Sequence, residues 1–370
     1  DVRAHLEAEN AYTEAVLSHT KGAQKALYAE LKARIKADDS SVAAPDGAYA
    51  YYQRFETTSQ HPIFCRRPTG SEVGELVLLD ANREAEGKPF FRVSAAEHSP
   101  DHARFAFAVD AQGSELHTLV VRDAKTGEVL DEAVHRAAGS FEWANDSATL
   151  FYTALDDHHR PSRVFRHTLG DAQAQDDLIY EEPDAGFFVG LGKTQSRRFV
   201  MINSHDHQTS ETRLVVADGG DEPPRLLLAR EPGMEYDVGH HGDMLFIHTN
   251  AGDAEDFRIV QAPLGDPSPG AWTDVVPHRP GVLILGMRVF RDHLVRRERV
   301  DGLPRIVVRR LADGAEHTIA FDEETFDLSM VPGYEFDTTT LRFVYSSLAT
   351  PREIYDYDLE SRDRSLRKRQ

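Results

Sequence analysis

Phe105-Ala-Phe-Ala-Val109 is followed by a polar loop, then by Leu116-His-Thr-Leu-Val-Val-Arg122, then by the turn Asp123-Ala-Lys-Thr-Gly-Glu128. Both apolar stretches have the length and composition of β-strands, and Gly127 supplies the positive φ that a tight hairpin needs. A further strand begins at Val129 after this turn. Together the segments predict consecutive antiparallel strands joined by short connections.

One more strand precedes this group, predicted at Phe90-Phe-Arg-Val93 and separated from it by the turn Ser99-Pro-Asp-His102. The resulting four-stranded unit recurs seven times, and the ends of its third strands lie 44 to 56 residues apart. A repeat of roughly 40–50 residues made of short strands is typical of a propeller blade, because one such unit cannot bury its own faces. The predicted blades are 45–85, 89–136, 139–182, 186–231, 235–277, 282–321 and 325–369. We therefore expect an all-β fold, a seven-bladed β-propeller.

The first 37 residues have a helical pattern instead. Leu27, Leu31 and Ile35 recur at intervals of four residues among charged side chains, and Gly22 is expected to separate two helices. The predicted organisation is a short N-terminal helical extension, residues 1–40, followed by a propeller over residues 41–370.

Composition limits the classes of partner. Lys and Arg number 42 against 62 Asp and Glu, a net charge of −20, which argues against nucleic acid and anionic membranes as partners. The single cysteine, Cys65, excludes an internal disulfide, fits a reducing compartment and is expected to be buried. No apolar run is long enough to span a membrane, and no signal peptide is visible. A cytoplasmic location is expected, with a periplasmic one left open, and the start at Asp1 looks excised from a longer chain.

The motifs of catalytic and metal sites are missing. No Gly-x-Ser-x-Gly stretch and no His-Glu pair occur. His205 and His207 have no third ligand fixed by spacing, and Pro100 precludes the helix that would bring His98 and His102 together. We therefore expect no catalytic residue, no metal and no cofactor in this chain.

Loop topology identifies a candidate working face. In a four-stranded blade (strands A to D), the B–C loops and the D–A crossings lie at the same end. Arg160 and Glu211 fall in B–C loops of blades three and four, and Glu181 and Glu182 fall in the crossing between those blades. We expect these charges on one rim, where they either form an ion-pair latch to another domain or a basic peptide, or are solvated loop charges.

Several segments together resemble the prolyl oligopeptidase family of serine peptidases, and within it the oligopeptidase B branch. The segments are Leu6-Glu-Ala-Glu-Asn-Ala-Tyr-Thr13, Ile35-Lys-Ala-Asp-Asp-Ser-Ser-Val42, Leu150-Phe-Tyr-Thr153, Arg160-Pro161 with Arg163-Val164, Arg166-His167, Phe188-Val-Gly190, Thr209-Ser-Glu211, Glu235-Tyr-Asp237, Tyr345-Ser-Ser-Leu348, Ile354-Tyr-Asp-Tyr-Asp358 and Lys368-Arg-Gln370. Their order and spacing cover essentially the whole chain.

The resemblance implies a division of labour. Such peptidases pair a seven-bladed propeller with an α/β-hydrolase domain that carries the Ser-Asp-His triad, and that domain would begin after residue 370. The propeller would then cover the active site and admit only short peptides, in the oligopeptidase B branch those cleaved after Arg or Lys. The chain alone would be inactive, its partners being its own hydrolase domain and short, basic peptides. The alternative is a stand-alone propeller that acts as a protein- or peptide-binding scaffold.

Overall fold

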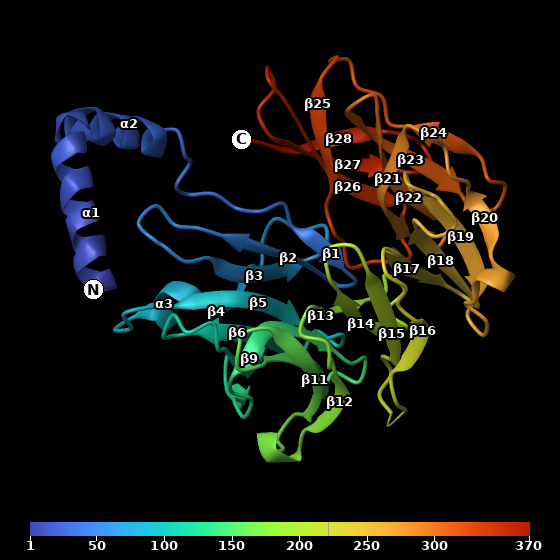
Figure 1. Ribbon diagram of the computed structural model, residues 1–370, viewed down its shortest axis with the longest axis horizontal. Coiled ribbons are helices and arrows are strands. Elements are labelled where there is room, and N and C mark those ends of the chain that lie inside the picture. The colour runs from blue at the N-terminus through green and yellow to red at the C-terminus, as the bar shows by residue number, and fades with distance from the viewer. Residues whose placement is uncertain (221) are drawn as a thin grey trace.

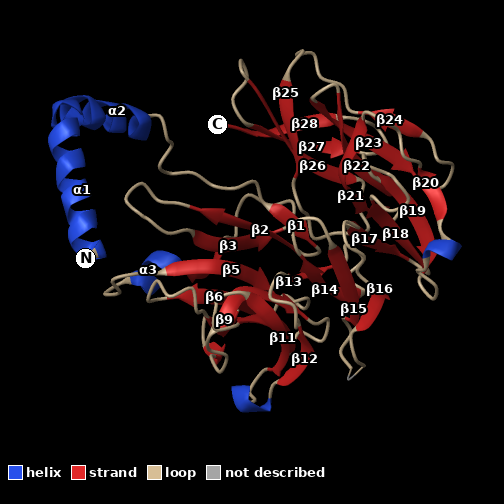
Figure 2. Ribbon diagram, in the orientation of Figure 1, coloured by secondary structure: helices blue, strands red, loops and turns tan. Residues whose placement is uncertain are grey.

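The computed structural model describes residues 1–220 and 222–370. Its strands form seven four-stranded antiparallel sheets, and each sheet consists of four strands consecutive in sequence. The sheets are arranged as the blades of a propeller (Figures 1 and 2). The expected seven-bladed β-propeller is confirmed.

The four strands of each blade have the following bounds. Blades one to four contain β1 Ala44–Asp46, β2 Tyr49–Arg54, β3 Ile63–Pro68 and β4 Leu76–Asp80; β5 Arg92–His98, β6 Arg104–Asp110, β7 Thr118–Asp123 and β8 Val129–Asp131; β9 Ala137–Trp143, β10 Thr149–Leu155, β11 Pro161–Thr168 and β12 Asp177–Glu181; β13 Phe188–Lys193, β14 Phe199–His205, β15 Ser210–Val216 and β16 Arg225–Leu228. Blades five to seven contain β17 Tyr236–His241, β18 Met244–Thr249, β19 Arg258–Pro263 and β20 Thr273–Val276; β21 Val282–Val289, β22 His293–Val300, β23 Leu303–Arg310 and β24 Glu316–Thr318; β25 Phe326–Met330, β26 Thr340–Ser347, β27 Glu353–Asp358 and β28 Arg364–Arg369.

The first strand of each blade is innermost. Contacts between β5 and β9, β9 and β13, and β17 and β21 bring first strands of neighbouring blades together. Along β9 the residues alternate between buried and half-buried: Phe141 and Trp143 belong to the core shared with blade two, whereas Glu142 between them lines a cavity on the axis. This arrangement surrounds an axial channel with side chains from the first strands.

Apolar cores lie between adjacent blades. Among the described residues, six clusters of buried side chains join blades one to two, two to three, and so on to blades six and seven. No such cluster of described residues fills the junction between blades seven and one, where Tyr334 alone joins the core of blades one and two. That junction is held by polar contacts, including the Lys368 ammonium 2.6 Å from an Asp39 carboxylate oxygen.

The N-terminal helices differ from the expected break. α1 spans Val2–Leu17 and α2 spans Lys21–Ala33, with a short 3₁₀ turn at Ser18–Thr20 between them, so Gly22 lies inside α2. The prediction that Gly22 separates the helices was wrong. The Ser18 and Thr20 hydroxyls donate to the carbonyls of Ala15 and Leu17, and this local bonding redirects the backbone. Both helices stand apart from the sheets and have no buried residue (Figure 1).

Aspartates shape many of the turns. In the hairpin after β7, the Asp123 carboxylate accepts from the backbone N–H groups of Lys125 and Thr126, and Gly127 has φ 75° as expected. The first strand of blade two, expected at residues 90–93, instead runs over Arg92–His98, because its pairing with β6 continues to Phe105. Phe91 lies buried just before it.

Candidate functional site

The end of the propeller that carries the B–C loops and the D–A crossings is called here the B–C end. β1 begins and β28 ends at this end, so the N-terminal helical segment is joined to the propeller on this side. The Lys368 ammonium, which pairs with Asp39, also donates to the Ser40 carbonyl 2.6 Å away. The opposite end, with the A–B and C–D turns, is called the A–B end.

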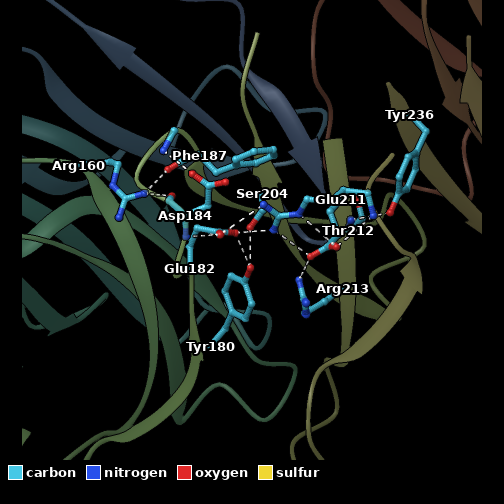
Figure 3. A network of polar contacts seen from close by, with 12 residues as sticks. Arg160, Tyr180, Glu182, Asp184, Phe187, Ser204, Glu211, Thr212, Arg213 and Tyr236 are labelled. Carbon is cyan, nitrogen blue, oxygen red and sulfur yellow. Dashed lines mark hydrogen bonds and ion pairs between the residues drawn. The ribbon is translucent and has the colours of Figure 1, made fainter. Parts of the chain in front are cut away.

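A buried ion-pair network lies at the B–C end between blades three and four (Figure 3). The Arg230 guanidinium is 2.6 Å from a Glu182 oxygen and 3.2 Å from a Glu211 oxygen. The Glu182 side chain has no exposed area and that of Glu211 is 6% exposed, whereas Arg230 is 25% exposed. Arg230 therefore connects two buried carboxylates and presents its own edge to solvent.

Chain topology explains why these three residues meet. Glu182 directly follows β12, Glu211 is the second residue of β15, and Arg230 follows β16 by two residues. All three positions are at the B–C end of adjacent blades. The ring of Phe187 lies under the Arg230 guanidinium, 4.0 Å from its central carbon, a cation–π contact that fixes the side chain.

Further hydrogen bonds complete the coordination of both carboxylates. The Tyr180 hydroxyl and the Asp184 N–H donate to Glu182 at 2.7 and 2.9 Å, and Arg213 pairs with Glu211. Burial alone would raise the pKa of Glu182, but hydrogen bonds from Arg230, Tyr180 and Asp184 outweigh it and hold that pKa at about 2. The pKa of Glu211 is likewise lowered, against burial, by its two arginines. Both groups are carboxylates at neutral pH.

Arg160 is attached to the same region through backbone. Its guanidinium is 2.9 Å from Asp156 and donates to the carbonyls of Phe187, at 2.8 Å, and Asp184 (Figure 3). It thereby fixes the segment 184–187 that also contacts Glu182 and Arg230. Glu181, on β12, is exposed, and among the described residues its side chain forms no hydrogen bond or ion pair.

The structure thus brings together three of the four residues singled out in the sequence, Arg160, Glu182 and Glu211, and leaves Glu181 outside the network. Sequence reasoning missed Arg230, the residue that joins the two carboxylates. The topological rule that selected Glu182 applies equally to Arg230, since both lie in D–A crossings. That shared position was the signal that could have identified it.

A second polar region lies on the axis. At the A–B end a cavity of about 390 Å³ is lined by Glu97, Glu142, Lys193 and Arg288, each from or beside a first strand. Burial, assisted by the nearby Glu97 carboxyl, raises the pKa of Glu142 to about 8. Lys193 donates to the Trp143 carbonyl at 2.8 Å. The cavity lining therefore combines basic side chains with acidic ones whose pKa values are raised by burial.

Within the described residues, no helix is long and apolar enough to cross a membrane. Cys65 is buried, as expected, and burial raises the pKa of its thiol to about 12.

Comparison with known proteins covers the whole chain. Residues 1–370 match the family model described as prolyl oligopeptidase, N-terminal β-propeller domain. The chain is 35% identical to dipeptidyl aminopeptidase BI of Pseudoxanthomonas mexicana, over 100% of this chain and 53% of that protein. It is 31% identical to protease 2 of Moraxella lacunata, over 98% of this chain and 53% of that protein.

Solved structures agree with this assignment. Oligopeptidase B from Leishmania major superposes with a TM-score of 0.92 at 30% identity, over 100% of this chain and 54% of that one. Oligopeptidase B from Trypanosoma brucei, in a closed form with bound antipain, gives 0.90 at 30% identity, with the same coverage. The chain spans about half the length of the relatives it matches. It belongs to the prolyl oligopeptidase family, whose N-terminal β-propeller domain it matches from end to end.

Proposed function

We propose that the complete protein is a serine oligopeptidase and that this chain is its non-catalytic propeller, which covers the active site and admits short peptides only. The observation that carries the proposal is the match of all 370 residues to the N-terminal propeller of the family. The sequence contains no Gly-x-Ser-x-Gly motif, so in this proposal the nucleophile belongs to an α/β-hydrolase domain after residue 370.

The B–C end is the proposed face toward that domain. In support, the chain enters β1 and leaves β28 at this end, so a following domain would be attached there. The network of Glu182, Arg230 and Glu211 is internally paired, and its proposed role is to hold the rim segments in place. Glu181, being exposed and unpaired among the described residues, is the proposed partner for a cationic group of the hydrolase domain or of a peptide.

Cleavage after Arg or Lys is the proposed specificity, and the net charge of −20 supports a preference for cationic peptides. Two arms of one experiment test it on the complete protein. Chromogenic peptides ending in Arg or Lys, with a blocked N-terminus, should be hydrolysed, and peptides ending in Ala or Phe should not. A free-amine dipeptide substrate tests the alternative mode that the name of the Pseudoxanthomonas relative indicates.

Size filtering is tested with one cleavable sequence placed in a peptide of about ten residues and in a folded protein loop. Hydrolysis of both at similar rates would contradict the covering role. Absence of hydrolysis and of labelling by a serine-directed inhibitor would favour the alternative, a propeller that binds peptides or proteins as a scaffold. Arg160→Ala and Glu181→Gln should each change kcat and its salt dependence in the complete protein. Unchanged kinetics would leave Arg160 with a structural role in the rim and Glu181 as a solvated loop charge.

A further inference from the structure

Three side chains with metal-ligating atoms converge at the A–B end, far from the face described above. They are Asp46 at the end of β1, His98 at the end of β5, and His102 in the turn that follows. One ligand atom from each lies within 4.8 Å of the other two, and no other such group occurs among the described residues. Asp46 and His98 are each 5% exposed, so the group is built into the protein interior.

The ligand atoms are directed at one another. Nε2 of His98 lies 2.7 Å from Oδ2 of Asp46. Nδ1 of His102 is occupied by the Tyr51 hydroxyl at 2.9 Å, which leaves Nε2 of His102 as its available ligand atom. A Cβ placed on Gly47, the residue after Asp46, would be 3.5 Å from that Nε2, so the nitrogen faces the Asp46 turn and no side chain intervenes from Gly47.

Neighbouring groups hold the ligands in orientation. The Tyr51 ring stacks on His98 with centroids 3.6 Å apart, and the His98 and His102 rings are 5.3 Å apart and nearly parallel. The guanidinium of Arg197 is 2.6 Å from Oδ2 of Asp46. A hydrogen bond to the outer atom of an imidazole ligand, such as that between the Tyr51 hydroxyl and Nδ1 of His102, is the usual support of a metal site, whereas Arg197 shares the Asp46 oxygen that faces His98.

We propose that Asp46, His98 and His102 form a binding site for a divalent transition-metal ion of the zinc class. Two imidazoles and one carboxylate are a donor set that zinc and cobalt accept in four-coordinate geometry, with metal–ligand distances of about 2.0–2.2 Å. The ion takes the place of the hydrogen between His98 and Asp46, whose 2.7 Å separation widens to accommodate two metal–ligand bonds, and Nε2 of His102 approaches as the third ligand. The fourth position faces the axial cavity of about 390 Å³, which Asp46 and His98 line.

The site would connect two blades. Asp46 belongs to blade one and both histidines belong to blade two. The other side of blade one faces blade seven, and that junction has no apolar core cluster among the described residues. An ion bound here would add a second link to the apolar core that already joins blades one and two, on the side of blade one away from that junction. Binding to the folded state alone stabilises that state in proportion to the logarithm of the ion concentration. The Arg197 charge beside Asp46 weakens the attraction for the cation, so the site should bind less tightly than a fully anionic one.

The test uses Co²⁺ and Zn²⁺ on the complete, metal-stripped protein. Four-coordinate Co²⁺ absorbs strongly in the visible range, whereas hydrated Co²⁺ hardly does, and Zn²⁺ should displace it. We expect this band in the unmodified protein and in the control His205→Gln/His207→Gln, whose exposed histidines lie at the opposite end. His102→Gln, a change at a half-buried turn residue, should abolish the band. Thermal unfolding should shift upward by about 3 °C at a hundredfold excess of Zn²⁺ over its Kd, and His102→Gln should lose this shift.

Two results would overturn the proposal. One is a visible band and thermal shift of equal size in the unmodified protein and in His102→Gln. The other is the absence of a four-coordinate band in the unmodified protein at millimolar Co²⁺, which would leave the three residues as a hydrogen-bonded packing cluster. Circular dichroism of His102→Gln establishes that the variant is folded, and Asp46→Asn, which keeps the shape of the side chain, provides a second ligand variant with the same expected loss.

Discussion

Replacing Arg230 by Met removes one positive charge from a site where two carboxylates are buried. Met keeps an unbranched apolar side chain, but it loses the cation–π contact with Phe187 and leaves Glu182 and Glu211 without their common partner. Removing one member of a buried ion pair costs about 3–5 kcal/mol. Since Arg230 is 25% exposed and Arg213 still pairs with Glu211, we expect the lower end, about 3 kcal/mol at pH 7.

The pH dependence gives the prediction a second, independent test. The folded-state pKa of Glu182 is about 2, below its ordinary value of 4.5. Its contribution to stability is therefore fully present above pH 4.5 and is lost as the pH falls toward 2. At about 1.36 kcal/mol per pKa unit, and allowing for screening at the rim, this contribution is about 2 kcal/mol. In Arg230→Met the carboxyl gains stability on protonation instead, so the difference between the two proteins should shrink markedly at pH 3.

Urea unfolding at pH 7 and pH 3, followed by the fluorescence of Trp143 and Trp272, measures both effects. Arg198→Met is the matched control, because Arg198 pairs with Asp218 in the same blade but both side chains are about half exposed. Such a pair contributes about 0–1 kcal/mol. A loss for Arg230→Met no larger than that for Arg198→Met, or a loss equal at both pH values, would refute the reasoning.

Three further outcomes are expected. Cys65, buried and with its thiol pKa raised to about 12, should not react with a thiol reagent at pH 8 until the chain is unfolded, and rapid reaction of the native protein would contradict its burial. The pKa of Glu142 is raised to about 8, so its contribution to stability is present below pH 4.5 and is lost as the pH rises through 8. Relative to the unmodified chain, Glu142→Gln should therefore become more stable as the pH rises from 5 to 9. Parallel stability profiles of the two proteins over this range would argue against a raised pKa of Glu142. A Cβ at Gly239 would overlap a methyl group of Val289 in the next blade, so Gly239→Ala should lower stability by about 1–3 kcal/mol in the same urea assay, whereas Gly265→Ala, where nothing lies within 4 Å, should not.

The blades were predictable because each repeats a local signal. Apolar runs of four to eight residues, turn aspartates and glycines such as Gly127 act within one blade, and their spacing alone indicates radial stacking. The helix break was not predictable from Gly22, because the hydroxyls of Ser18 and Thr20 compete for backbone carbonyls at the turn before it. Such competition is decided by local geometry rather than by the presence of a glycine.

The contacts between blades were harder to predict than the blades. Pro100 does preclude a helix, yet the turn it helps to form, with His102 at φ 62°, stacks His98 and His102 all the same. Spacing rules test one secondary structure at a time, whereas Asp46 and Arg197 reach this cluster from other blades. The same limitation hid Arg230, whose two carboxylates lie 48 and 19 residues away in sequence.

The junction between blades seven and one is the mechanical consequence of building each sheet from consecutive strands. Among residues 1–220 and 222–370 no strand is exchanged between the first and last blades, so the ring closes through contacts that involve side chains. The Gly47 N–H donates to Glu335 at the A–B end, Lys368 pairs with Asp39 at the B–C end, and Arg342 donates to the Ala43 carbonyl. Ion pairs and single hydrogen bonds contribute about 0–1.5 kcal/mol each, and exposed ion pairs weaken as the salt concentration rises. The six apolar clusters are not weakened by salt in this way. The first opening of the ring under denaturant or high salt is therefore expected at this junction, next to the blade that carries Asp46.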